Sequence, residues 1–66
     1  MNSLFPNLVA AMEQRGVSNK NLADAIGLSE DVVLFKMQGV LDWTLVEALT
    51  ICRYLHCTDL KFLFLR

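Results

Sequence analysis

The sequence has few of the residues that divide a chain into several units or that build catalytic sites. Its 66 residues include one Pro, three Gly and a single His. No linker, internal repeat or low-complexity tract interrupts the chain, so we predict one domain over residues 1–66. With one His, no Gly-rich phosphate loop and no paired carboxylates in an evident pocket, we predict that the protein is not an enzyme and has no small-molecule substrate.

Long hydrophobic runs and cysteines are also scarce. No apolar run approaches the roughly 20 residues of a membrane span, and the chain does not open with a basic segment and a hydrophobic signal core. We therefore expect a cytoplasmic location and no membrane partner. Cys52 and Cys57 are expected to be reduced thiols, because no secretion signal accompanies them. With His56 they supply three metal-ligand types but no fourth, so we predict no zinc site and no cofactor.

Hydrophobic residues, by contrast, are abundant for so small a domain. They make up 55% of the chain, and the mean hydropathy is +0.41. A domain of this size buries only about 60% of the surface that its unfolded chain exposes. One core therefore cannot hide every apolar side chain, and we expect part of the apolar surface to meet a partner.

The segment 18–39 predicts two short helices joined by a tight turn, at about 19–26 and 30–38. Gly27 stands where a chain leaving a helix often needs positive φ, and the Ser29 hydroxyl can cap the start of the second helix. Apolar side chains recur at helical spacing in both segments: Leu22, Ala23 and Ile26 in the first, Val33 and Met37 in the second. The pattern indicates a helix-turn-helix.

Three further helices complete an all-α, five-helix prediction. The first is predicted to begin near Pro6 and to stop at Gly16. Thr44 and Glu47 have the spacing of a capping box for the fourth, and Thr58 is the expected cap of a short last helix. The expected apolar positions of these last two helices are Leu45, Ala48, Leu49, Cys52 and Leu55, then Leu60, Phe62, Leu63, Phe64 and Leu65.

The central motif resembles that of the Cro and lambda-repressor-like (Xre-type) family of DNA-binding domains. That family typically shows Gln-x-x-Leu-Ala-x-x-Leu-Gly-x-Ser, and the same register here is occupied by Asn19, Leu22, Ala23, Ile26, Gly27 and Ser29. The FPNL opening and the run WTLVEALTICRYL are also similar, so the resemblance covers nearly the whole chain. It implies a sequence-specific double-stranded DNA-binding transcriptional regulator of phage or bacterial type, acting as a homodimer.

The resemblance also implies roles for individual residues. In this family the second motif helix lies in the major groove, and the start of the preceding helix grips phosphates. Asn19 occupies the position where a Gln commonly bonds a phosphate, and Lys20 and Lys36 are expected to add charge contacts. The expected DNA-binding set is Asn19, Lys20, Ser29, Glu30, Asp31, Val32, Phe35 and Lys36.

The charge of the motif departs from this pattern. Between residues 18 and 39, two cations, Lys20 and Lys36, accompany three anions, Asp24, Glu30 and Asp31. Nonspecific affinity for DNA comes mainly from cations that displace counterions from phosphates, so we predict weak binding. Glu can still accept from cytosine N4, and apolar side chains can contact a thymine methyl.

Each expected base-reading residue also has a structural alternative. Glu30 and Asp31 can serve only to complement the helix dipole, by roughly 0.3–1 kcal/mol each. Val32 and Phe35 share a helix face and can pack against a neighbouring element, or they can anchor a protein partner. The alternative function is therefore a degenerate helix-turn-helix scaffold that acts as a protein-interaction module with little DNA affinity.

The C-terminal segment is the expected homodimer surface. Its apolar residues lie on several faces of a short helix, and one small core can bury only some of them. In the alternative arrangement Leu60, Leu63 and Phe64 cover the core of a monomer and the remaining residues fray.

Overall fold

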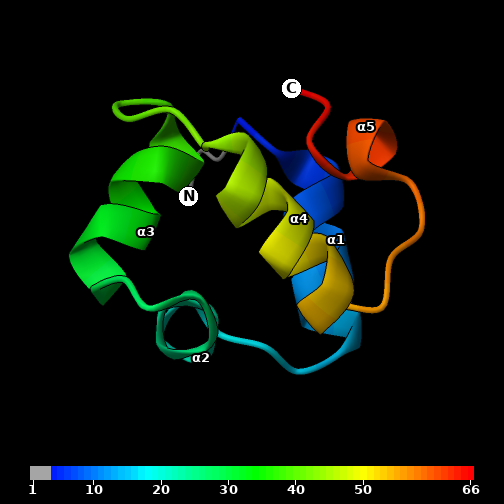
Figure 1. Ribbon diagram of the computed structural model, residues 1–66, viewed down its shortest axis with the longest axis horizontal. Helices are drawn as coiled ribbons and strands as arrows, with labels where there is room; N and C mark the ends of the chain where they lie inside the picture. The colour runs from blue at the N-terminus through cyan, green and yellow to red at the C-terminus, as the bar shows by residue number, and fades with distance from the viewer. Residues whose placement is uncertain (1–3) are drawn as a thin grey trace.

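The computed structural model describes residues 4–66, which form five helices and no strand (Figure 1). The helices are α1 (Pro6–Gln14), α2 (Asn19–Ile26), α3 (Glu30–Gln38), α4 (Leu45–Tyr54) and α5 (Leu60–Leu63). Both motif helices have the bounds predicted from the sequence, and the all-α, five-helix prediction is confirmed. In the view of Figure 1, α4 crosses the middle of the molecule, with α3 on one side and α5 on the other.

Polar caps and left-handed glycines fix the ends of the motif helices. The Ser18 hydroxyl accepts from the Asn21 backbone N–H at 3.1 Å, and the Asn21 side chain accepts from the Ser18 N–H at 3.2 Å. Ser29 caps α3 by accepting from the Val32 N–H at 3.3 Å. Gly27 has φ 76°, a conformation that costs a residue with a Cβ more than it costs Gly. The predicted turn between the helices is therefore present.

The caps of the last two helices agree with the sequence prediction at one helix and differ at the other. Thr44 and Glu47 form the predicted capping box of α4. The prediction that Thr58 caps α5 is wrong, because Asp59 holds that position and accepts from the Phe62 N–H at 3.1 Å. The helix begins one residue later than a Thr58 cap requires, at Leu60, and its Leu63 is buried.

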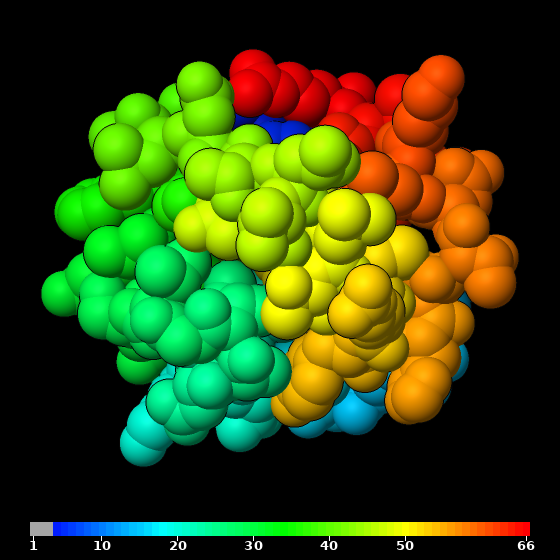
Figure 2. Space-filling view, viewed as in Figure 1, coloured from blue at the N-terminus to red at the C-terminus, as the bar shows by residue number. Residues whose placement is uncertain are grey.

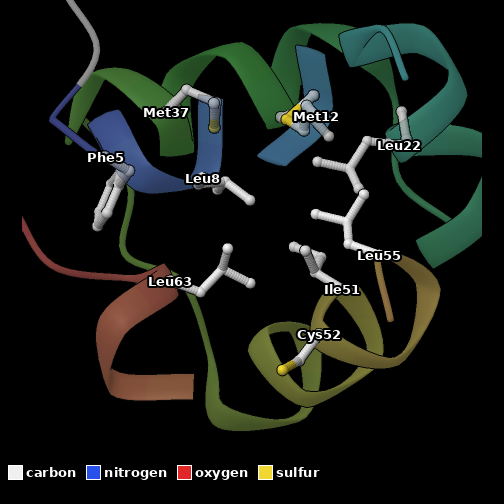
Figure 3. Packing of buried hydrophobic residues seen from close by; sticks show 11 residues of the cluster. Phe5, Leu8, Met12, Leu22, Met37, Ile51, Cys52, Leu55 and Leu63 are labelled. Atoms are coloured by element: carbon white, nitrogen blue, oxygen red, sulfur yellow. The ribbon is translucent and has the colours of Figure 1, made fainter. Parts of the chain in front are cut away.

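The core lies between α1, the motif helices and α4 (Figure 3). Leu8, Leu22 and Val33 are completely buried, and Ala23 lies 2% exposed where α2 packs against α3 and α4. The full set of buried apolar residues is Phe5, Leu8, Met12, Leu22, Ala23, Val33, Met37, Ala48, Ile51, Cys52, Leu55 and Leu63. This core holds α3 by one face and leaves its other face at the surface.

The predicted apolar stripe of α4 is partly wrong. Leu45 and Leu49 are 67% and 43% exposed, whereas Ile51 is completely buried. The helix is apolar on more than one face, so periodicity alone does not decide which face meets the core. Of residues 4–66, none lies in a helix long and apolar enough to cross a membrane.

Candidate nucleic-acid interface

The first turn of α3 is presented to solvent. Glu30 and Asp31 are exposed, and Phe35, one turn further on, is 44% exposed. Val32 is half-buried, whereas the neighbouring Val33 belongs to the core. The structure therefore leaves most of the expected base-reading side chains accessible on α3, the helix at the left of Figure 2.

The start of α2 supplies a second group of polar atoms. Lys20 is exposed and Asn19 is half-buried. These two residues follow the Ser18 cap, at the helix positions whose backbone N–H groups have no partner within the helix. Such groups suit phosphate oxygens, and the positive end of the helix dipole favours an anion there.

Lys36, which was expected to add a charge contact to DNA, lies away from these exposed residues. Its side chain is only 10% exposed, and its ammonium forms an ion pair with the Glu47 carboxylate. The same ammonium lies 5.6 Å from the centre of the Trp43 ring. Three residues after buried Val33, Lys36 is on the inward face of α3 and points toward the start of α4.

Glu47 is held ionised by this arrangement. Burial alone raises the pKa of its carboxyl, but the hydrogen bond from Lys36 and the bond from the Thr44 N–H lower the pKa below its ordinary value. The Thr44 bond is 2.9 Å long. Glu47 therefore caps α4 and joins it to α3 at the same time, a role that the capping-box pattern did not reveal.

The exposed residues of the motif carry a more negative net charge than the motif as a whole. Once Lys36 is paired with Glu47, Lys20 is the one exposed cation in residues 18–39. Asp24, Glu30 and Asp31 are all exposed. A phosphate backbone near α3 therefore meets two carboxylates in the first helical turn, with a single lysine to offset them.

Besides Phe35, the loop after α3 and the first turns of α4 expose apolar side chains that the sequence analysis did not identify. We call these side chains together the α3–α4 apolar surface, which comprises Phe35, Val40, Leu41, Leu45, Val46 and Leu49. The backbone N–H groups of Val40 and Leu41 both donate to the Phe35 carbonyl, at 2.9 and 3.4 Å, and so hold the loop beside α3. The loop and the first turns of α4 share the face turned to the viewer in Figure 2.

The C-terminal segment divides into inward and outward side chains. Leu63 is buried, and Phe64 packs edge-on against Phe5 and Trp43, with ring centres 6.0 and 5.9 Å apart. Phe62 and Leu65 are 57% and 54% exposed. Leu60 and Phe64 also pack against the core cluster. Two apolar side chains therefore remain accessible to a partner.

The residues considered for a metal do not form a group of ligands. Both cysteines, Cys52 and Cys57, are free thiols. In the part of the chain that the structure describes, no three His, Cys, Asp or Glu side chains gather where they could hold a metal ion.

One comparison with known proteins gives a match. A sequence model described as the Cro/C1-type helix-turn-helix DNA-binding domain matches residues 7–60. This range extends from the second residue of α1 to the first residue of α5, and so includes the whole motif. No curated protein and no solved structure matches the chain.

Proposed function

The chain belongs to the Cro/C1-type helix-turn-helix DNA-binding domain family, and we propose that it is a sequence-specific, double-stranded DNA-binding transcriptional regulator of phage or bacterial type, acting in the cytoplasm. The observation that supports this proposal most is the position of α3, whose first turn is exposed while its opposite face is fixed in the core. A helix held in this way can enter a major groove without unfolding any part of the domain.

In this proposal the exposed edge of α3 reads bases. Glu30 and Asp31 accept hydrogen bonds, so they suit the N4 amino group of cytosine or the N6 amino group of adenine. Val32 and Phe35 suit the methyl group of thymine. None of these four side chains can donate to guanine O6 or N7. The expected half-site therefore presents amino and methyl groups to the helix in its major groove.

The proposed phosphate contacts come from Asn19, Lys20 and Ser29. Lys20 alone carries a charge, so each subunit displaces about one counterion. The logarithm of the binding constant should then fall with the logarithm of salt concentration with a slope of about −1 per subunit, or about −2 for a dimer. Regulators with many Lys and Arg contacts have much steeper slopes.

A homodimer is part of the proposal. The exposed Phe62 and Leu65 supply apolar groups that a second copy can cover across a two-fold axis. Two copies of α3 about 34 Å apart would reach successive major grooves of one DNA face. A dimer also presents two Lys20 charges to one DNA duplex, one from each subunit.

A fluorescence-polarization titration with labelled genomic DNA fragments at two salt concentrations tests the proposed function. The proposal expects some fragments to bind more tightly than a random duplex, with the shallow salt dependence given above. Equal, undetectable binding of all fragments at low salt would contradict it.

Two observations favour a second function, that of a protein-interaction module with little DNA affinity. The α3–α4 apolar surface presents six exposed apolar side chains, and the first turn of α3 carries the exposed carboxylates of Glu30 and Asp31. Both features suit a protein partner better than a phosphate backbone. Replacing Val46, which is 73% exposed and lies outside the proposed DNA contacts, with Asp separates the two functions. The regulator proposal expects DNA binding to persist in Val46→Asp.

A further inference from the structure

The carboxyl end of α4 brings the two cysteines into one backbone motif. The Cys57 N–H donates to the Cys52 carbonyl at 2.9 Å, and the His56 N–H donates to the Arg53 carbonyl at 3.1 Å. Between them His56 takes φ 55°, in the left-handed region. This is the Schellman pattern, in which the two residues joined by the outer bond commonly bring their side chains together.

The two residues joined by the outer bond here are both cysteines. The Cys52 Sγ donates to the Cys57 carbonyl oxygen at 2.9 Å, so the first sulfur lies directly against the backbone of the second cysteine. The Cys57 Sγ lies 3.7 Å from the Leu55 carbonyl, within the same corner. Leu55, at the base of this corner, is completely buried.

The two thiols differ in access to solvent. Cys52 is 7% exposed and belongs to the core cluster, and burial raises the pKa of its thiol. Cys57 is half-buried and lines a surface hollow of about 410 Å³, together with His56, Thr58 and Asp59. An oxidant that enters this hollow therefore meets Cys57 first, with Cys52 behind it.

We propose that Cys52 and Cys57 form an oxidisable dithiol, which a hydroperoxide converts to a disulfide across the end of α4. Cys57 loses its thiol proton to solvent, its sulfur attacks one peroxide oxygen, and the O–O bond breaks. The product is a sulfenic acid on Cys57, and the leaving oxygen takes up a proton. The Cys52 sulfur then attacks the sulfenic sulfur, the S–O bond breaks, and the departing hydroxide leaves as water with the Cys52 proton. With hydrogen peroxide, two thiols and one peroxide give one disulfide and two waters.

The fold makes this reaction different from that of a flexible peptide. In an unfolded chain the two thiols meet at the millimolar effective concentration of a short flexible linker. In the folded chain the Schellman bonds already hold both cysteines in one corner, so the effective concentration of the thiols should rise by about tenfold or more. Folding and disulfide formation are linked in one thermodynamic cycle. The disulfide should therefore raise the equilibrium constant for folding by the same factor. Oxidation thereby fastens the corner from which α5 departs.

The full chain is equilibrated in buffers of reduced and oxidised glutathione, once folded and once in concentrated urea. Alkylation followed by intact-mass measurement gives the disulfide fraction, and hence the effective concentration of the thiols, in each state. Hydrogen peroxide is applied separately to wild type, Cys57→Ser and Cys52→Ala, with dimedone present to trap sulfenic acid. We expect the folded wild type to lose about 2 Da, to resist alkylation and to remain one chain on a non-reducing gel. Cys52→Ala should accumulate the dimedone adduct on Cys57, and Cys57→Ser should oxidise more slowly than wild type.

Several results would overturn the proposal. The first is an equal effective concentration of the thiols in the folded chain and in urea. This comparison needs only the wild type, so it holds even if a variant fails to fold. The second is a folded wild type that yields disulfides between chains or sulfinic acids instead of an internal disulfide. The third is a Cys57→Ser variant whose Cys52 reacts at the wild-type rate.

Discussion

The ion pair between Lys36 and Glu47 gives the sharpest test of how the motif is built. Lys36→Met keeps the aliphatic stem and removes the ammonium, Glu47→Gln keeps a side-chain oxygen for the Thr44 cap, and the double variant measures the coupling. The side chains of the pair are 10% and 18% exposed. Removing one partner of a fully buried pair costs about 3–5 kcal/mol, whereas an exposed pair contributes about 0.2–1 kcal/mol.

The expected loss of stability lies between these limits. Glu47 keeps its bond from the Thr44 N–H when Lys36 is gone, and solvent reaches part of the carboxylate. We therefore expect Lys36→Met to lower the free energy of unfolding by about 2 kcal/mol. A domain of this size changes its Tm by roughly 4–8 °C per kcal/mol, so the Tm should fall by about 8–16 °C.

The effect should also depend on pH. Burial raises the pKa of Glu47, but hydrogen bonds from Lys36 and the Thr44 N–H outweigh it and leave the pKa below the ordinary value of 4.5. A carboxyl whose folded pKa is lowered stabilises the fold above its unfolded pKa, and this contribution is lost as the pH falls through the folded pKa. The difference between wild type and Lys36→Met should therefore be full at pH 7 and shrink below pH 4.5.

Thermal and urea unfolding, followed by circular dichroism at pH 7 and below pH 4.5, measures the loss of stability and its dependence on pH. DNA titrations of the same variants test the position of Lys36. If Lys36 is buried in the ion pair, a folded Lys36→Met variant should bind DNA with the same salt slope as wild type. A Lys36→Met variant as stable as wild type, but with weaker and less salt-dependent DNA binding, would show that Lys36 is not held in a stabilising ion pair. Lys36 would then be a phosphate contact.

The remaining predictions concern the exposed surface. Lys20→Ala should weaken binding to all DNA sequences alike and reduce the salt slope by about one unit per subunit; polarization titrations measure this, and an unchanged slope would remove Lys20 from the interface. Replacing Glu30 and Asp31 with Gln and Ser should strengthen nonspecific DNA binding, since two carboxylates no longer repel phosphates; a folded double variant that binds no better would argue that α3 does not approach DNA. Phe62→Asp and Leu65→Asp should shift sedimentation equilibrium toward monomer, and a dimer untouched by both would exclude the C-terminal surface.

The sequence was sufficient for those parts of the fold that depend on local chemistry. Ser29 and Gly27 mark the ends of the motif helices because a hydroxyl cap and a left-handed residue are needed there. The Thr44–Glu47 capping box was equally local. Asp59 was missed because Thr58 and Asp59 are both good caps, and the choice between them depends on where α5 meets the core.

The parts that could not be predicted depend on which face of a helix is buried. Lys36 has the spacing of a core position, three residues after Val33, but a lysine is rarely expected there unless its partner is known. That partner, Glu47, lies on another helix. Leu45 and Leu49 were assigned to the core because α4 is apolar on several faces, and only its packing selects Ile51 instead.

We propose that the exposed start of α3, together with the start of α2, is the surface that meets DNA. Backbone amide chemical shifts of the isotope-labelled chain, recorded while a mixed-sequence duplex is added at low salt, test it most directly. We expect shift changes concentrated at residues 19–20 and 29–35, with little change at Val46 and Leu49. Changes confined to residues 40–49, or no changes at all, would contradict this proposal.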